Sequence, residues 1–322
     1  MQNFIRLCVI RKKTYNFAER KLILSKTIIM REEYYELNAR YLNPLTDFGF
    51  RKIFGTESNK DLLIDFLNQV IKEEGLIVDV NYLKPEQLGN FEKDRKAVFD
   101  IFCTTENGEY FIVEMQKANR AFFRERCIYY TTFPIQQQAQ KGIWNFRLNT
   151  VYLVGILDFI LFDEFKEDKE QVVEYVSLMR ERTKTVFSNK LKFAFVQLPK
   201  FRKTEKELEN QFDKWLYLLK NLPKLETKPA AVQGRIFEKL FELSEIEQIK
   251  ETEMDTYRKS VMEYYDVQNC MEYAREGDRE KWREEGRKEG IQKCLQKNIA
   301  IEDVVFLKGY SKEQITNYMA KS

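Results

Sequence analysis

Histidine is absent from this chain of 322 residues. Catalysis by Ser-His-Asp or Cys-His groups, HNH-type chemistry and zinc sites built with histidine are therefore excluded. No glycine-rich phosphate-binding loop is present, so chemistry driven by a bound nucleotide has no support. The few cysteines include no Cys-x-x-Cys pair, which argues against a zinc ribbon or a disulfide framework and is typical of reduced thiols. These cysteines are Cys8, Cys103, Cys127, Cys270 and Cys294.

Long hydrophobic runs are also missing. The most apolar stretch, residues 151–162, contains Asp158 and is shorter than the roughly 20 apolar residues that a membrane-spanning helix needs. We interpret this stretch as a buried central strand, and we expect a cytoplasmic protein with no membrane contact. The basic N-terminus lacks the apolar centre and cleavage site of a signal peptide. Because Met30 begins a stretch that reads like a natural start, residues 1–29 are expected to be a disordered or mis-assigned extension.

Two apolar runs, residues 97–103 and 110–116, are joined by Glu106-Asn107-Gly108 and predict a hairpin of buried strands. Asp100 lies in the first run, and Glu114 and Gln116 lie in the second. A carboxylate in a buried strand is costly unless an Arg, a Lys or a bound cation compensates its charge. Two neighbouring carboxylates strengthen the case for a cation, and Mg²⁺ prefers such hard oxygen ligands.

The length of the loop decides whether the two acids meet. With a two-residue loop, Asn107-Gly108, the acids would face opposite sides of the hairpin. With a three-residue loop that ends on Gly108 in the left-handed conformation, Asp100 pairs with Glu114, and Gln116 points to the same side. We predict the second register because Gly108 stands where the loop needs glycine. A structural ion pair with Arg95, Arg124 or Arg126 explains the acids equally well at this point.

Several further motifs resemble one known family. They are NPLTDFGFRKIFG at residues 43–55, DLLIDFLN at 61–68, FDIFC at 99–103, NGE at 107–109, IVEMQ at 112–116 and RERCIYY at 124–130. In this order and spacing they resemble the Rpn family of recombination-promoting nucleases and related transposases, within the PD-(D/E)XK nuclease superfamily. The resemblance implies an α/β fold with a restriction-endonuclease-like core, in which helices flank a central mixed sheet, and a helical C-terminal extension.

The resemblance also implies a function. It is that of a DNA endonuclease dependent on Mg²⁺, with Mn²⁺ as an alternative, in which Asp100 and Glu114 bind the metal. Gln116 stands where the superfamily has lysine; it can hold a water but cannot carry a charge. Asp47 is a further candidate catalytic acid, although Thr46-Asp47 is also typical of a helix N-cap. The alternative function is a catalytically weak or inactive relative that binds DNA or a protein partner.

The net charge of +3 does not by itself predict a nucleic-acid binder. Basic residues nevertheless gather around the proposed site, as a DNA backbone would require. Phe122 and its aromatic neighbours could stack on bases, although such residues beside a helix more often belong to a core. The predicted DNA-binding residues are Arg95, Lys117, Arg124, Arg126 and Tyr130.

The chain is expected to divide into several segments. After residues 1–29, we predict a nuclease-like domain at 30–200, a helical extension at 201–270, and a charged linker helix with a small helical tail at 271–322. The C-terminal helices are the expected site of homo-oligomer formation. Within the domain, we predict helices near 47–56, 59–74 and 120–141 and strands near 77–83 and 149–158.

Overall fold

The computed structural model describes residues 39–71, 76–87, 97–139, 144–165 and 170–271. The chain separates into two compact units, Met1–Val267 and Gln268–Ser322, and the first contains nearly all described residues. The predictions for residues 1–29 and for Arg95 lie outside the described residues. The prediction for 271–322 also lies outside them, apart from residue 271.

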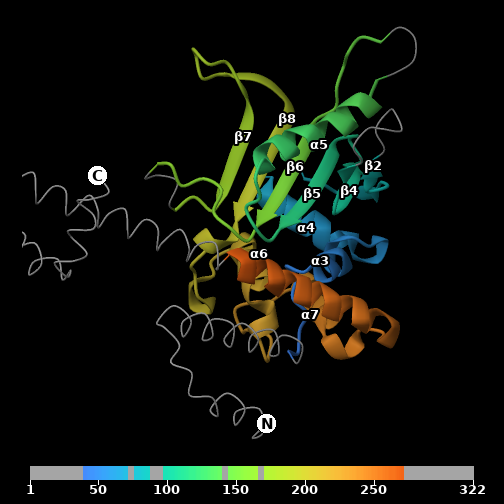
Figure 1. Ribbon diagram of the computed structural model, residues 1–322, viewed down its shortest axis with the longest axis vertical. Helices are drawn as coiled ribbons and strands as arrows, with labels where there is room; N and C mark the ends of the chain where they lie inside the picture. Colours follow the sequence, from blue (N-terminus) through green and yellow to red (C-terminus); the bar gives the residue numbers. More distant parts are fainter. Residues whose placement is uncertain (1–38, 72–75, 88–96, 140–143, 166–169, 272–322) are drawn as a thin grey trace, which may run out of the picture. The chain divides into compact units, whose positions relative to one another are not determined.

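A mixed sheet of six strands forms the centre of the first unit (Figure 1). Its strands, in spatial order, are β1 (Val80–Tyr82), β4 (Ile101–Thr105), β5 (Tyr110–Gln116), β6 (Val151–Leu157), β8 (Val186–Gln197) and β7 (Val173–Met179). The pairs β5–β6 and β6–β8 are parallel, whereas β1–β4, β4–β5 and β7–β8 are antiparallel. The short strands β2 (Glu86–Gln87) and β3 (Ala97–Val98) pair separately.

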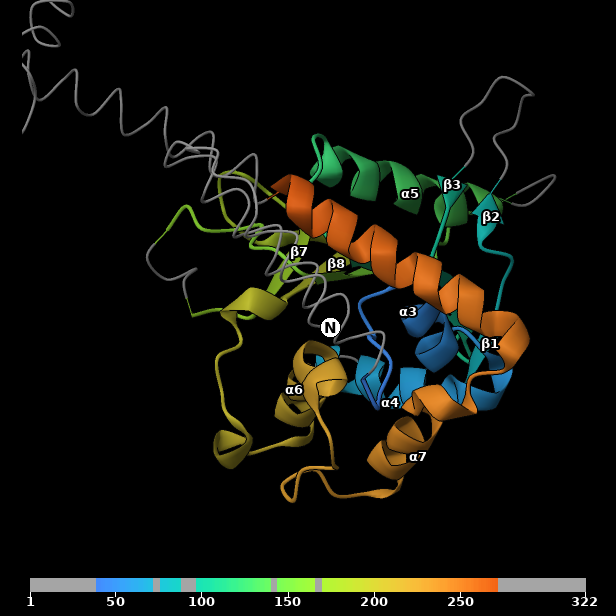
Figure 2. The same ribbon diagram turned by 60° about the horizontal axis from the view of Figure 1, so that its bottom comes forward.

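Helices cover both faces of this sheet (Figure 2). One face carries α5 (Phe123–Gln137). The other carries α3 (Asp47–Phe54), α4 (Lys60–Val70), α6 (Gln211–Asn221), α7 (Arg235–Ser244) and helical residues 251–267. The remaining helical turns are 3-10 turns at Glu57–Asn59, Leu198–Lys200, Glu205–Glu207, Leu222–Lys224 and Ile246–Gln248. The predicted α/β arrangement, a central mixed sheet flanked by helices, is confirmed.

Alternation along the strands explains why two cores form. Phe111, Val113 and Met115 of β5 point into the core with α3 and α4, whereas Ile112 points into the core with α5. Since successive side chains of a strand point to opposite faces, a continuous apolar strand can serve both layers. The first part of the apolar run at 151–162 is confirmed as a central strand, because every residue of β6 is buried, whereas residues 158–162 lie beyond the strand.

Local signals set the helix starts that matter for the site. The Thr46 hydroxyl accepts a hydrogen bond from the backbone N–H of Gly49 at 3.1 Å and so caps α3. The helices predicted near 47–56, 59–74 and 120–141 are confirmed as α3, α4 and α5, apart from residues 72–74 and 140–141, which lie outside the described residues. The strands predicted near 77–83 and 149–158 are confirmed as β1 and β6.

The helices after residue 201 share the core of α3 and α4. The buried ring of Trp215 in α6 lies 5.6 Å from the ring of Phe54 and 5.7 Å from that of Phe66, measured between ring centres. It also lies 5.4 Å from the ring of Phe237 in α7. These contacts join α6 and α7 to the layer that supports β5. Among the described residues, no helix has the length and apolar character needed to cross a membrane.

Candidate active site

The hairpin between β4 and β5 has the predicted three-residue loop. Gly108 has a φ of +78°, and its N–H donates to the Thr105 carbonyl at 3.0 Å. Ile101 pairs with Val113, and continuing this register by one residue places Asp100 opposite Glu114. The predicted register is confirmed. Gly108 allows it, because only glycine adopts this left-handed loop position without steric cost.

The carboxylates of Asp100 and Glu114 each accept a hydrogen bond from a backbone amide at the end of the hairpin. The Asp100 N–H donates to Oε1 of Glu114 at 3.2 Å, and the Met115 N–H donates to Oδ2 of Asp100 at 2.9 Å. Each carboxylate is therefore held by an amide of the neighbouring chain segment. The structure brings the two predicted metal ligands together.

Burial disfavours the charged forms of both acids. It is the largest cause of the rise in the pKa of Glu114 from its usual 4.5 to about 8, and the negative charge of Asp100 raises it further. The pKa of Asp100 is also raised, first by burial and then by the negative charge of Asp47. The hydrogen bond from the Met115 N–H acts in the opposite direction. Without a cation, the site therefore favours holding a proton, and a divalent ion would relieve this cost.

Gln116 connects the acids to helix α5. Its Nε2 donates to Oε2 of Glu114 at 3.3 Å, and its Oε1 accepts a hydrogen bond from Nη2 of Arg126 at 2.6 Å. Arg126 therefore fixes which way the Gln116 amide points. The guanidinium also places a positive charge near Glu114 that partly offsets the rise in its pKa. Gln116 is thus a neutral amide beside Glu114 with an arginine behind it.

Asp47 lies on the same side as Asp100 but comes from α3. Thr46 is the N-cap, so Asp47 is the first residue of the helix and is available for other contacts. Its Oδ1 forms an ion pair with Nζ of Lys117 at 2.9 Å. Arg51, one turn further along α3, lies 4.0 Å from Oδ1 of Asp100 through its Nη2. This long contact leaves the Asp100 carboxylate incompletely compensated.

A cavity of about 420 Å³ opens over these groups. It is lined by parts of α3, the end of β5, α5 and the helix at 251–267. Because several elements meet there, acids and cations that are distant in sequence surround one space. The charged and amide residues among its lining are Asp47, Asp100, Gln116, Lys117, Arg120, Arg126, Glu263 and Asp266.

The predicted DNA-binding residues are distributed unevenly around this cavity. Lys117 and Arg126 line it. Tyr130 packs on the buried ring of Phe99, with 5.1 Å between ring centres, and beneath Arg126. Arg124 points elsewhere: it donates to the Leu161 carbonyl at 3.0 Å and pairs with Glu164 at 2.9 Å.

Three residues near the acids were not singled out by sequence as parts of the site. They are Arg51, which approaches Asp100, and Glu263 and Asp266, which line the cavity. Glu263 and Asp266 are three residues apart on one helix, and this spacing predicts a shared face. It does not predict what that face meets. Their place follows from the packing of residues such as Tyr257, whose hydroxyl accepts a hydrogen bond from the Asn43 N–H at 3.1 Å.

The carboxylates of Asp100 and Glu114 suit a hard divalent cation. Asp100 lines the polar cavity and the buried Glu114 lies next to Asp100, and burial raises the pKa of both carboxyls, so a cation would favour their charged forms. Within the described part of the chain, no three His, Cys, Asp or Glu side chains form a complete ligand set. Two carboxylates are still consistent with Mg²⁺, which commonly keeps several waters.

Comparison with known proteins identifies one family. The family model described as PD-(D/E)XK nuclease family transposase matches residues 44–274, which is more than half of the chain. The match includes both strands of the hairpin and the helix that carries Glu263 and Asp266. No curated protein and no solved structure gives a significant match.

Proposed function

Since this chain belongs to the PD-(D/E)XK nuclease family transposases, we propose that it is a Mg²⁺-dependent endonuclease that hydrolyses phosphodiester bonds of DNA. A role in recombination or in a mobile element follows from the same premise. The observation that carries the proposal is the meeting of two under-compensated carboxylates, Asp100 and Glu114, beside a cavity edged with cations.

Asp100 and Glu114 would hold Mg²⁺, with Mn²⁺ as an alternative. When bound, such an ion lowers the pKa of a water and stabilises negative charge on a phosphate. Asp47 is the proposed further acid of the site, because its charge acts on Asp100 across the cavity. Its ion pair with Lys117 holds it in place.

The remaining side chains position the reactants. Gln116 uses one amide hydrogen on Glu114 and one carbonyl lone pair on Arg126, which leaves the second amide hydrogen to hold a water. Lys117, Arg120 and Arg126 bring positive charge to the cavity, where a phosphate of DNA would lie. Gln116 cannot take up a proton near neutral pH, so its role is orientation.

Plasmid nicking tests the proposal. The wild-type protein should convert supercoiled plasmid to nicked or linear DNA with Mg²⁺ and not with EDTA, and Asp100→Ala should abolish the reaction. Glu109→Gln is the matched control, because Glu109 lies at the other end of the same hairpin beside Thr105. Cleavage that persists in Asp100→Ala, or that ignores EDTA, contradicts the proposal.

Metal binding has a readout that does not depend on cleavage. The melting temperature of the wild-type protein should rise with Mg²⁺ or Mn²⁺, because a ligand that binds only the folded state stabilises it. The rise should disappear in Asp100→Asn and in Glu114→Gln.

The second candidate function is DNA binding without cleavage. The neutral amide of Gln116 at the superfamily lysine position favours this alternative, because it cannot supply a charge. DNA retention without nicking, under conditions where metal raises the melting temperature, would support it. Cytoplasmic location and self-association through the C-terminal helices stay predictions.

A further inference from the structure

Phe122 is the most exposed large apolar residue beside the proposed site. The residue is 77% exposed, and it has a φ of +61° immediately before α5. The left-handed conformation is unfavourable for a residue with a bulky side chain. The next residue, Phe123, is buried and contacts the rings of Phe159 and Phe195. The chain therefore buries one ring and presents the adjacent one to solvent in a strained backbone position.

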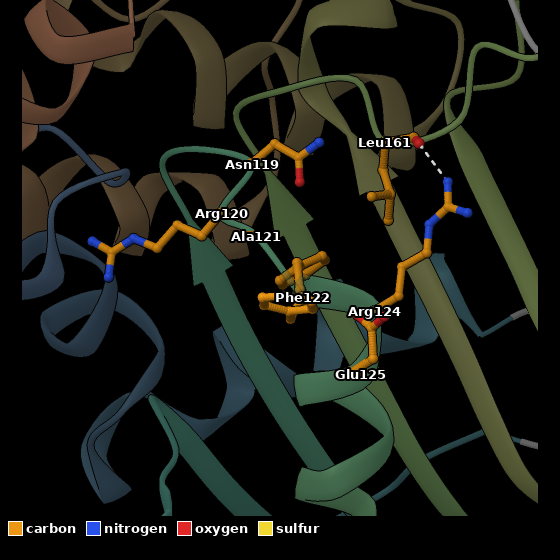
Figure 3. Close-up of a pocket in the computed structure, with 8 residues that line it drawn as sticks. Asn119, Arg120, Ala121, Phe122, Arg124, Glu125 and Leu161 are labelled. Carbon is orange, nitrogen blue, oxygen red and sulfur yellow. Dashed lines mark hydrogen bonds between the residues drawn. The ribbon is translucent and has the colours of Figure 1, made fainter.

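Phe122 lines a second cavity. It has a volume of about 400 Å³ and is lined in part by Asn119, Arg120 and Arg124 (Figure 3). Figure 3 shows Arg120 and Arg124 extending in opposite directions on either side of Phe122. Arg124 is fixed to the Leu161 carbonyl. Among the described residues Arg120 has no ion-pair partner, so its charge is available to a ligand.

Arg120 also lines the cavity that holds Asp100 and Gln116. The two cavities therefore share one cation, and only six positions separate Gln116 from Phe122 in the sequence. A nucleic-acid strand whose phosphate lies at the acids would bring a neighbouring nucleotide to Phe122. A cationic path with an exposed aromatic ring beside it is the usual arrangement for binding a strand through its backbone and its bases.

We propose that Phe122 stacks on a base of the bound DNA strand, next to the phosphate at Asp100 and Glu114, and that Arg120 contacts the intervening backbone. This inference rests on the proposed function, because it takes DNA to be the ligand of the acidic cavity. The stacked base comes either from single-stranded DNA or from a duplex into which the ring inserts. In both cases Phe122 is a positioning residue that acts on binding.

Fluorescence anisotropy with one oligonucleotide, as a single strand and as a duplex, tests the inference in EDTA. Phe122→Ala should weaken binding roughly 5- to 150-fold, which is the usual effect of removing one base–aromatic stack. Phe122→Trp should retain binding. The matched control is Phe146→Ala, because Phe146 is 76% exposed with a φ of +58° but lies outside both cavities.

Two further measurements separate stacking from stability. Phe122→Gly should bind as weakly as Phe122→Ala while keeping or raising the melting temperature, because glycine adopts a positive φ readily. A 2-aminopurine base in the strand should change its fluorescence with wild-type protein and not with Phe122→Ala. A loss on the single strand alone assigns the stack to an unpaired base, and a loss on both substrates assigns it to an inserted ring.

The outcomes distinguish this inference from the proposed function. If the wild-type protein nicks plasmid and Phe122→Ala binds DNA as tightly as wild type, the stacking role is wrong and the nuclease assignment stands. If Phe122→Ala weakens binding in a protein that never cleaves, the nuclease assignment is wrong and the stacking role stands. A wild-type protein that binds neither oligonucleotide, or equal losses in Phe146→Ala, overturns the stacking role.

Discussion

Two buried carboxylates of this molecule, Glu114 at the end of β5 and Asp213 in α6, are compensated in different ways. Glu114 is 4% exposed and Asp213 is 6% exposed. Asp213 accepts hydrogen bonds from Nζ of Lys203 at 2.8 Å and from the Glu209 N–H at 3.0 Å. Glu114 accepts from amide groups of Asp100 and Gln116, and no lysine or arginine of the described residues forms an ion pair with it.

The difference teaches how a structural acid can be told from a functional one. A buried carboxylate with its own cation is electrostatically complete and serves to hold elements together. One that is held only by neutral donors, next to a second acid, carries a raised pKa and attracts an external cation. Exposure and residue type alone do not separate the two cases.

Glu114→Gln should produce the largest effect on activity. We expect DNA cleavage to fall on the order of 100-fold or more, because charge stabilisation by a bound metal contributes several kcal/mol. The same variant should raise the melting temperature in EDTA at neutral pH, since glutamine removes the cost of binding a proton at Glu114 on folding. Nicking assays and thermal melts check both effects. A variant that cleaves normally and has a lower melting temperature would show that Glu114 is a structural acid, as Asp213 is.

Arg126→Ala should reduce cleavage by roughly 10- to 100-fold, the usual cost of losing a residue that orients a metal-site group. The loss should appear in kcat, because Arg126 holds the Gln116 amide in place. Arg126→Lys should restore part of it. The control is Arg124→Ala, because Arg124 bonds Leu161 and Glu164 instead of Gln116. Equal losses in kcat for the two alanine variants would contradict this orienting role.

Asp213→Asn should change stability and not chemistry. Removing the charge that Lys203 and the Glu209 N–H contact should lower the free energy of unfolding by about 1–3 kcal/mol. Urea denaturation measures this loss. Cleavage per folded molecule should equal that of the wild type, so a specific loss of kcat would break the comparison between the two acids.

The pH dependence of the metal-free protein should reflect the raised pKa of Glu114. The unfolded chain releases the Glu114 proton near its usual pKa of 4.5, whereas the folded protein keeps this proton up to a pKa of about 8. The folded state binds more protons between these values, so its stability should fall as the pH rises from 4.5 to about 8. Melting temperatures in EDTA at several pH values measure the fall. Glu114→Gln should have a flatter profile, and an equal slope in both proteins would contradict the raised pKa.

Much of the hairpin could be predicted from local sequence. Gly108 after Glu106-Asn107 sets the loop, the loop sets the register, and the register makes Asp100 and Glu114 neighbours. These steps involve residues close in the chain, whose conformations are limited by backbone sterics and strand alternation. The strand and helix order followed from apolar periodicity for the same reason.

The surroundings of the acids were decided by tertiary structure. The sequence left open whether an arginine neutralises them, and packing sends Arg124 to Glu164 and Arg126 to Gln116. Glu263 is far from β5 in sequence, and it reaches the cavity only through the packing of its helix. The sequence by itself determined the two carboxylates and their register, whereas the cations around them depend on long-range packing that no local pattern encodes.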